Sequence, residues 1–159
     1  MNYFELFDIP VALKTDKSTL AKKYFELQKQ YHPDFYTQAG ESEQADALEK
    51  SSVINKALQV LKNEDETIKY VLQQKGLLEE EEKYSLPPDF LMEVMDLNEN
   101  LSEHSILAIT NFEQDIYEKV KDIIDQYDDN TTTTEALLKV KEYYYKKKYL
   151  QRILDRISG

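Results

Sequence analysis

The chain has 159 residues, 41% of them hydrophobic, which is enough for one core or two small ones. It has no cysteine and only two histidines, His32 and His104, which excludes disulfides, thiolate catalysis and histidine-rich metal sites. Its net charge of −11 argues against nucleic acid as the main partner. Residues 1–75 carry 10 basic and 12 acidic groups, whereas residues 76–159 carry 10 and 19, so we expect the two halves to do different electrostatic jobs.

The N-terminal stretch does not resemble a targeting segment. It begins Asn2–Phe7 with an acid at Glu5 and another at Asp8, unlike a signal peptide or an arginine-rich transit peptide. No apolar run approaches the roughly 20 residues of a membrane span. We therefore expect a cytoplasmic protein with no membrane partner. With 3 glycines and 4 prolines in the whole chain, helix is expected almost everywhere, and the predicted fold class is all-α.

The first half of the chain is expected to hold four helices. Pro33 disfavours the α conformation at His32, so the helix before it should end near Tyr31. Gly76 suits the left-handed position that closes the fourth helix. The expected helices run from Asn2 to Leu6, from a cap at Asp16 or Ser18 to Tyr31, from Glu41 to Leu61, and from Asn63–Glu66 to Gln74. Their expected apolar stripes are Leu20, Tyr24, Leu27 and Tyr31; Ala45, Leu48, Ser52, Ala57 and Leu61; and Ile68, Val71 and Leu72.

A polar stretch with two prolines separates the halves. The acidic run Glu79–Glu82 precedes Pro87 and Pro88, so we assign 1–75 to one domain, 76–86 to a linker and 87–159 to a second domain. Three helices are expected in the second domain: from Asp89 to about Asn98, from a cap at Ser102 to about Tyr127, and from a cap among the threonines 131–134 onwards. The middle helix has a bundle-type seam made of Ile109, Phe112, Ile116, Val120, Ile123 and Tyr127.

The tripeptide His32-Pro33-Asp34 lies between the second and third expected helices, at the tip of a helical hairpin. A proline-fixed turn presents a donor and a carboxylate with little conformational entropy left to lose. Three lysines on the preceding helix can steer it towards an acidic surface; they are Lys22, Lys23 and Lys29. The plainer alternative is that His32 and Asp34 only cap helix ends and that the lysines form an ordinary solvated face.

The first helix of the second domain carries too many apolar residues for one inward face. Phe90, Val94 and Leu97 compete for that direction with a second set, Leu91, Met92 and Met95. We expect the second set to form an exposed protein-binding patch with an acidic rim of Asp96, Glu99 and Glu103. The alternative is that Leu91, Met92 and Met95 belong to the core.

The segment Tyr143–Tyr149 combines tyrosines and lysines, a composition that suits stacking on single-stranded nucleic acid. Three consecutive tyrosines on a helix point in three directions, however, and the surrounding charge is negative. We expect Tyr144 and Tyr145 to serve the bundle core, and we expect no nucleic acid to bind.

The first half resembles a J-domain, on the tripeptide His-Pro-Asp, its lead-in Leu27–Tyr31 and the opening Tyr3–Phe7. Ser52–Ala57 in the third helix and Phe90–Glu93 after the linker narrow the resemblance to the HscB family, the J-type co-chaperones of iron–sulfur cluster assembly. The resemblance covers nearly the whole chain, with both domains in the same order. It implies an N-terminal J-domain hairpin and a C-terminal three-helix bundle in a roughly L-shaped molecule.

The resemblance also implies partners. J-domains stimulate ATP hydrolysis by a DnaK-class chaperone, which in this family is HscA, and His32, Pro33 and Asp34 would contact the ATPase. The second domain would bind the iron–sulfur scaffold IscU. The matching positions are Leu91, Met92, Met95, Asp96, Glu99, Glu103 and Tyr149. Such a protein has no catalytic site, cofactor or metal of its own, since the ATP and magnesium belong to the partner.

The sequence departs from the family pattern at Phe35, where J-domains commonly have lysine. It also departs around the start of the fourth helix, where Asn63-Glu64 and Thr67-Ile68 stand in place of the proline and the Arg-Ala pair expected there. Two rival readings stay open. One is a J-protein with other, general protein clients. The other is an enzyme that uses His32 and Asp34 as an acid–base pair, and it requires a pocket around that pair.

Overall fold

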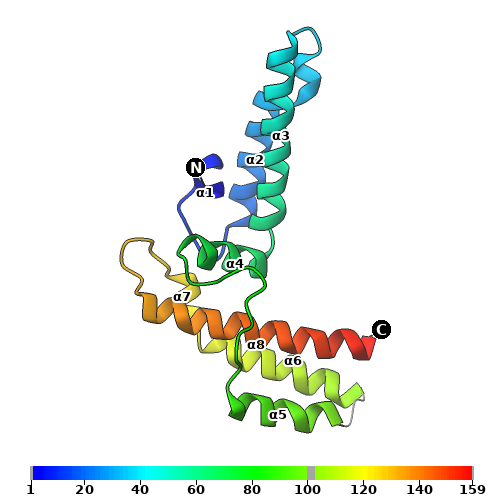
Figure 1. Ribbon diagram of the computed structural model, residues 1–159, viewed down its shortest axis with the longest axis vertical. Helices are drawn as coiled ribbons and strands as arrows, with labels where there is room; N and C mark the ends of the chain where they lie inside the picture. The colour runs from blue at the N-terminus through cyan, green and yellow to red at the C-terminus, as the bar shows by residue number, and fades with distance from the viewer. Residues whose placement is uncertain (1, 100–102, 159) are drawn as a thin grey trace. The chain divides into compact units, whose positions relative to one another are not determined.

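The computed structural model describes the backbone of residues 2–99 and 103–158 and the side chains of residues 2–97 and 104–157. The chain forms two compact units, Met1–Val71 and Leu72–Gly159. Within the described residues every regular element is a helix, which confirms the all-α prediction (Figure 1). In chain order the helices are α1 (Tyr3–Leu6), α2 (Lys17–Tyr31), the 3-10 turn η1 (Pro33–Tyr36), α3 (Glu41–Leu61), α4 (Glu64–Gln74), α5 (Pro88–Glu99), α6 (Glu103–Glu118), α7 (Lys121–Asp125) and α8 (Thr134–Ser158).

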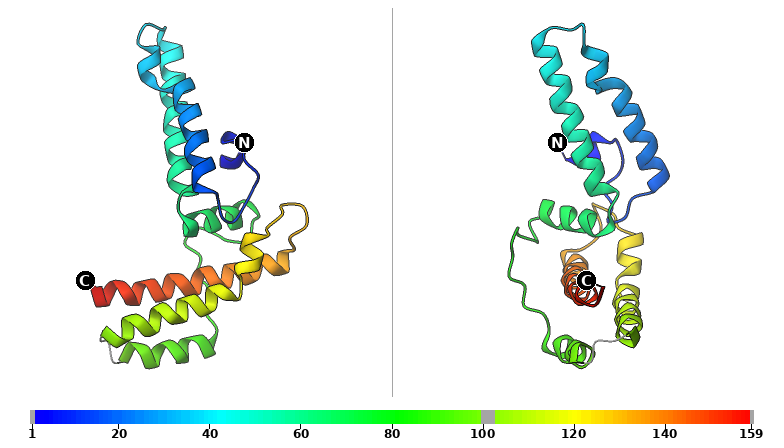
Figure 2. Two further views of the ribbon diagram at one scale, coloured as in Figure 1. Left: turned by 180° about the vertical axis from the view of Figure 1, so that it is seen from behind. Right: turned by 90° about the vertical axis from the view of Figure 1, so that its right-hand side faces the viewer.

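The hairpin of α2 and α3 forms the greater part of the first unit, and the two helices run side by side in both views (Figure 2). Asp16 caps α2, because its carboxylate accepts hydrogen bonds from the Thr19 amide at 3.2 Å and the Thr19 hydroxyl at 2.6 Å. These bonds lower the pKa of the Asp16 carboxyl, the hydroxyl contributing most. The helix ends at Tyr31, where the extended backbone of His32 (ψ 132°) meets Pro33. This end is the one predicted from the proline.

The buried face of α3 agrees with the predicted stripe at Ala57 and Leu61 but differs from it earlier in the helix. Ile54 is fully buried and Leu48 is 62% exposed, although Leu48 belongs to the predicted stripe. The residues that α3 buries are Ala47, Ser51, Ile54, Ala57 and Leu61. The predicted stripe is centred on Leu48, the only leucine in the first half of the helix, and includes Ala45 and Ser52. Ala45 and Ser52 are exposed as well. The true face includes a serine, which apolar spacing alone passes over.

Substituting one residue on each stripe tests the corrected face of α3. Ile54→Ala is expected to lower the free energy of unfolding by about 2–5 kcal/mol, because it leaves a cavity in a closed core. Leu48→Ala, its matched control, is expected to change that energy by no more than about 0.5 kcal/mol. Chemical denaturation of the full chain, followed by circular dichroism, measures both. If both variants lost the same free energy of unfolding, Leu48 would belong to the core after all.

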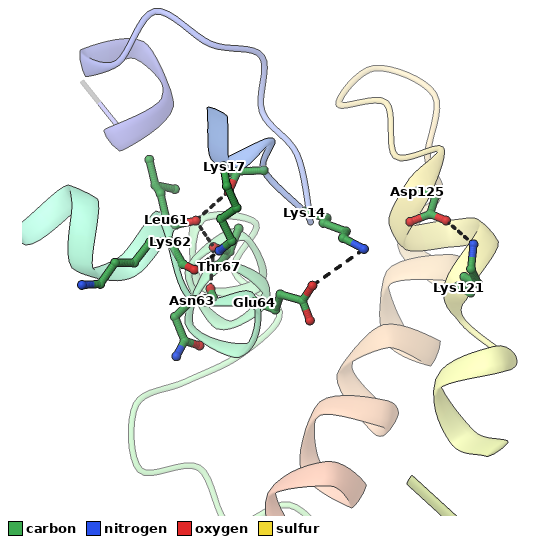
Figure 3. Close-up of polar contacts among 10 residues, drawn as sticks. Lys14, Lys17, Leu61, Lys62, Asn63, Glu64, Thr67, Lys121 and Asp125 are labelled. Carbon is green, nitrogen blue, oxygen red and sulfur yellow. Dashed lines mark hydrogen bonds and ion pairs between the residues drawn. The ribbon is translucent and has the colours of Figure 1, made fainter. Parts of the chain in front are cut away.

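Polar contacts connect the C-terminal end of α3 to the residues around the start of α2 (Figure 3). The Thr15 hydroxyl donates to the Leu61 carbonyl at 2.7 Å, and the Lys17 ammonium donates to the Lys62 carbonyl. The N-terminus of α4 is capped by Asn63, whose side-chain oxygen accepts from the Glu66 amide at 3.0 Å. The start of α4, for which the usual family residues are absent, is therefore fixed by this asparagine.

The short helix α1 lies against α4. The Tyr3 ring stacks on Tyr70 at a centroid distance of 4.6 Å, and the Tyr3 amide donates to the Tyr70 hydroxyl at 2.9 Å. Phe4 and Phe7 are buried beside this contact. At the far end of α4, Gly76 has φ of +72°, the left-handed conformation predicted for it.

In the second unit, α5, α6 and α8 pack as a layered bundle, with α7 against α8 (Figure 1). The middle helix was expected to run unbroken to Tyr127, and this is wrong, because α6 ends at Glu118 and α7 follows. At the break the Val120 amide donates to the Tyr117 carbonyl at 3.0 Å, a tightened turn rather than an α-helical bond. Val120 and Ile124 are buried on the two sides of the break, so after it the buried position is Ile124 and not the predicted Ile123, which is only half-buried. No proline or glycine announces this break.

The last helix begins as predicted among the threonines. The Thr133 hydroxyl accepts from the Ala136 amide at 3.1 Å, and α8 starts at the next residue, Thr134. The cap predicted at Ser102 lies outside the described residues.

The segment 76–86, which we expect to serve as a linker, packs on α8 through two of its side chains. Tyr84 stacks on Tyr145 at 4.6 Å between ring centroids, and Glu82 forms an ion pair with Lys141 at 2.7 Å. The side chains of Glu82 and Lys141 are only 20% and 14% exposed. Because such a pair is largely removed from water, losing one partner leaves the other poorly solvated.

This ion pair predicts acid sensitivity. The Lys141 hydrogen bond, followed by one from the Glu79 amide, holds the pKa of Glu82 below its ordinary value of 4.5. A carboxyl whose pKa is lower in the folded state stabilises the fold above its unfolded-state pKa, and this contribution disappears as the pH falls through the folded-state pKa. The melting temperature should therefore decrease as the pH is lowered below about 4.5. Glu82→Gln should lower the melting temperature at neutral pH and make its decrease with falling pH less steep.

Thermal unfolding of the full chain between acid and neutral pH measures this effect. Glu80→Gln is the matched control, since Glu80 is an exposed member of the same acidic run. Parallel melting-temperature curves for wild type and Glu82→Gln would contradict a stabilising role of the pair.

Candidate functional site

The predicted His-Pro-Asp turn folds as the start of η1. Pro33 occupies the first position of this turn, and the Asp34 amide donates to Nδ1 of His32 at 3.2 Å. An imidazole nitrogen that accepts a hydrogen bond carries no proton, so in this arrangement the proton of the neutral ring sits on Nε2. The Asp34 carboxylate also lies 3.6 Å from Nδ1, which would be an ion pair only if that nitrogen were protonated. We take the hydrogen bond as the state of the neutral ring, because it is shorter and closes the turn.

The turn is exposed to solvent, and hydrogen bonds from Gln44 and Tyr36 hold its backbone in place. The side chains of His32 and Asp34 are 46% and 85% exposed, so the Asp34 carboxylate stands in water and not in a substrate pocket. Gln44 on α3 donates from Nε2 towards three carbonyls of the loop, at 3.0 to 3.2 Å; they are Tyr36, Thr37 and Ala39. The Tyr36 hydroxyl donates to the Gln30 carbonyl at 2.7 Å. The sequence does not indicate these hydrogen bonds, because they depend on the conformation of the folded loop and not on a local residue pattern.

The three predicted lysines do not share one face of α2. Lys22 and Lys29 are exposed and lie seven residues apart, which places them on one strip of the helix. Lys23 points about 100° away, is only partly exposed, and pairs with Asp8 at 3.6 Å. The charge on the exposed strip therefore comes from Lys22 and Lys29.

The predicted patch lies on α5. Phe90 and Val94 are 4% and 1% exposed, so they take the inward direction, whereas Met92 and Met95 are 66% and 56% exposed. Leu91 is half-buried and Asp96 is exposed. Glu99 ends α5 and Glu103 begins α6, and their side chains lie outside the described residues.

Tyr149 on α8 is half-buried and makes an edge contact with Phe90 of α5 at 6.1 Å between ring centroids. It also lines a cavity of about 270 Å³ with Tyr84, Tyr145 and Arg152. Phe90 therefore links Tyr149 to the helix that carries the patch. On α6, which packs beside α5, Leu107 is 63% exposed. We did not single this leucine out, although its position off the predicted seam was a usable signal.

The tyrosine- and lysine-rich segment is occupied with the fold. Tyr143 and Tyr144 are buried and Tyr145 stacks on Tyr84, so these rings are not open to bases. Tyr144 is buried as expected, whereas Tyr145 is only half-buried. Tyr143, which we did not assign to the core, is buried as well and lies 5.8 Å from Tyr117 of α6 between ring centroids. Within the ranges described, no group of three or more histidine, aspartate or glutamate side chains is arranged to hold a metal ion. Nor does any helix there have the length and apolarity to cross a membrane.

Comparisons with known families and proteins match both halves. Residues 2–70 match the DnaJ domain family, and residues 86–158 match the HSCB C-terminal oligomerisation domain family. The co-chaperone protein HscB homolog of Vibrio vulnificus (strain YJ016) is 43% identical over 104 residues, which is 65% of this chain and 61% of that protein. The homolog of Psychromonas ingrahamii is 40% identical over 116 residues, 72% of this chain and 66% of that protein. The chain thus spans less than two thirds of the length of these relatives.

Two solved structures share the fold. The chaperone HscB from Vibrio cholerae superposes with a TM-score of 0.69 at 27% identity, covering 99% of this chain and 96% of that chain. The human co-chaperone protein HscB gives a TM-score of 0.80 over 99% of this chain and 81% of its own, and its 24% identity supports the fold alone.

Proposed function

Because the chain belongs to the HscB family of J-domain co-chaperones, we propose that it stimulates the ATPase of a DnaK-class chaperone, HscA, and delivers the iron–sulfur scaffold IscU to it. The single observation that carries this proposal is the exposed His-Pro-Asp turn at the tip of the hairpin. In this role the protein works in the cytoplasm and aids the assembly and transfer of iron–sulfur clusters. Its partner, and not this chain, binds the ATP and magnesium.

The geometry of the tip supports recognition by an ATPase. Pro33, the hydrogen bond from the Asp34 amide to His32 and the donation of the Gln44 side-chain amide to the loop carbonyls fix the turn before binding, so little conformational entropy remains to be lost. The Nε2 proton of His32 and the Asp34 carboxylate then offer one donor and one acceptor. Lys22 and Lys29 on α2 would steer the hairpin towards an acidic surface, and salt should slow that association.

The second unit supports a cargo role. Met92 and Met95 form an exposed apolar pair beside the acidic Asp96. Methionine side chains adapt to irregular partner surfaces, and an apolar centre with a polar rim is the usual anatomy of an interface. We propose that this patch, with Leu91, Glu99, Glu103 and Tyr149, binds the scaffold.

The alternative is a J-protein with general protein clients, and one experiment separates the two. The steady-state ATPase rate of the purified partner chaperone is measured with this protein alone, with the scaffold alone and with both. We expect stimulation by this protein and a further increase when the scaffold is added. If an unfolded model client replaces the scaffold equally well, the protein is a general co-chaperone. Absence of any stimulation would refute the J-domain function.

A further inference from the structure

Two phenylalanines of the first unit are exposed to solvent: Phe35 directly after Asp34, and Phe25 on α2 about two helical turns before the His-Pro-Asp turn. The chain has six phenylalanines, and Phe4, Phe7 and Phe90 are at most 4% exposed. Phe25 and Phe35, by contrast, are each 67% exposed. Large rings left exposed to solvent on one side of a hairpin, among polar groups, are typical of a binding surface and not of a folding requirement.

The two rings belong to one row. Phe25, Lys29 and His32 follow each other at spacings of four and three residues, which places them on one strip of α2 up to its end. The Lys29 ammonium lies 5.8 Å from the centroid of the Phe25 ring, and the Phe35 ring makes an edge contact with His32 at 6.2 Å. We call Phe25, Lys29, His32 and Phe35 the aromatic row. It is continuous with the turn proposed to contact the ATPase.

We propose that the aromatic row selects the chaperone partner, by docking on an ATPase-domain surface where exposed apolar side chains lie beside carboxylates. This inference rests on the proposed function and adds which chaperone the hairpin accepts. The lysine of the row requires an acidic group, because its charge is compensated on binding, and the two rings require apolar contacts that exclude water. A purely acidic surface meets the first requirement and fails the second.

Phe35 makes the selection two-sided. It follows Asp34 directly, at the position where J-domains commonly carry lysine. Where a chaperone surface carries an acidic group to meet a lysine at this position, an apolar ring would leave that group without its partner in a covered interface. The row therefore favours a chaperone with an apolar contact at this point and disfavours one with an acidic group there, which is what we expect of a general DnaK-type chaperone.

The test measures ATPase stimulation of two purified chaperones from the same organism, the HscA type and the general DnaK type, as a function of the concentration of the full chain. The double variant Phe25→Ser, Phe35→Ser is expected to raise the concentration for half-maximal stimulation of the HscA type at least about tenfold, because two large apolar contacts are lost. Its maximal stimulation should remain, since His32, Pro33 and Asp34 are untouched. Phe35→Lys is expected to move the preference towards the general chaperone.

Three controls sharpen the result. Phe25→Leu with Phe35→Leu keeps the apolar contacts and should recover most of the affinity. Val53→Ser removes another partly exposed apolar residue of the hairpin, 41% exposed on α3, and should leave stimulation unchanged. The serine variants should keep the wild-type melting temperature, because both rings are already in water.

The outcomes separate the two proposals. If the wild type stimulates neither chaperone, the proposed function falls and the partner selection with it. If the wild type stimulates the HscA type, and the serine double variant has the same half-maximal concentration, the aromatic row has no part in binding and only this inference is overturned. An equal loss with Val53→Ser, or a loss of scaffold binding with ATPase stimulation intact, overturns it as well.

Discussion

Replacing His32 with glutamine is expected to abolish stimulation of the partner's ATPase while leaving scaffold binding intact. The imidazole of His32 accepts one hydrogen bond within the turn and can donate another to the partner, and the longer glutamine side chain does not readily do both. Its Nδ1 accepts from the Asp34 amide at 3.2 Å and closes the turn, and this bond leaves Nε2 as a donor for the partner. Glutamine reaches similar positions only by fixing an extra rotatable bond, which costs conformational entropy. A buried interface contact of this kind is worth roughly 30-fold or more in stimulation.

The matched control is His104→Gln, which substitutes the only other histidine of the chain, an exposed residue of α6. It should stimulate like the wild type. Both variants should melt within a few degrees of the wild type, since neither histidine belongs to the core. ATPase rates over a range of co-chaperone concentrations, together with scaffold affinity by calorimetry, separate the two activities. Full stimulation by His32→Gln would remove this residue from the mechanism.

The strongest sequence predictions rest on signals that are local and chemically specific. Pro33 predicted the end of α2, Gly76 the left-handed residue after α4, and the threonines the start of α8, because each acts through the backbone of its neighbours. The weak ones depend on tertiary packing. The predicted stripe of α3 includes Leu48, whereas the face that α3 buries contains Ser51 and Ile54. The sequence does not show which face of α3 meets its neighbour α2. The break before α7 likewise lies where two helices, α6 and α7, each pack on α8, and no residue type marks it.

The same distinction applies to the site. The tripeptide identifies the tip, but its support by Gln44 spans five to eight residues and uses side chain to backbone bonds that no pattern announces. The sequence analysis grouped Lys23 with Lys22 and Lys29, because the pairing of Lys23 with Asp8 depends on the folded loop. The exposure of Phe25 was beyond the sequence, because a phenylalanine next to a predicted apolar stripe is usually core.

The substitution of Met92 and Met95 by alanine is expected to weaken scaffold affinity about 10- to 100-fold with little loss of stability. Both side chains are more than half exposed, so the free protein loses few contacts when they are removed. The bound state loses the burial of two large apolar side chains, each worth about 1.5–3 kcal/mol when fully covered, part of which the remaining alanines retain. We choose Met95 and not Leu91 for the double substitution with Met92, because Leu91 is half-buried and its substitution would also affect stability.

Two controls bracket this result. Val94→Ala removes a buried side chain, 1% exposed, from the opposite face of α5, and it should lower the melting temperature clearly. Leu138→Ala removes an apolar side chain that is 46% exposed on α8, and it should affect neither property. Calorimetric titration of each full-length variant with the scaffold, alongside thermal unfolding, gives both quantities. A double methionine variant that melts like Val94→Ala would place these residues in the core, and one that binds like wild type would move the scaffold site away from α5. Since His32→Gln should leave this affinity unchanged, the two variants together test whether the stimulating and carrying surfaces are separate parts of one chain.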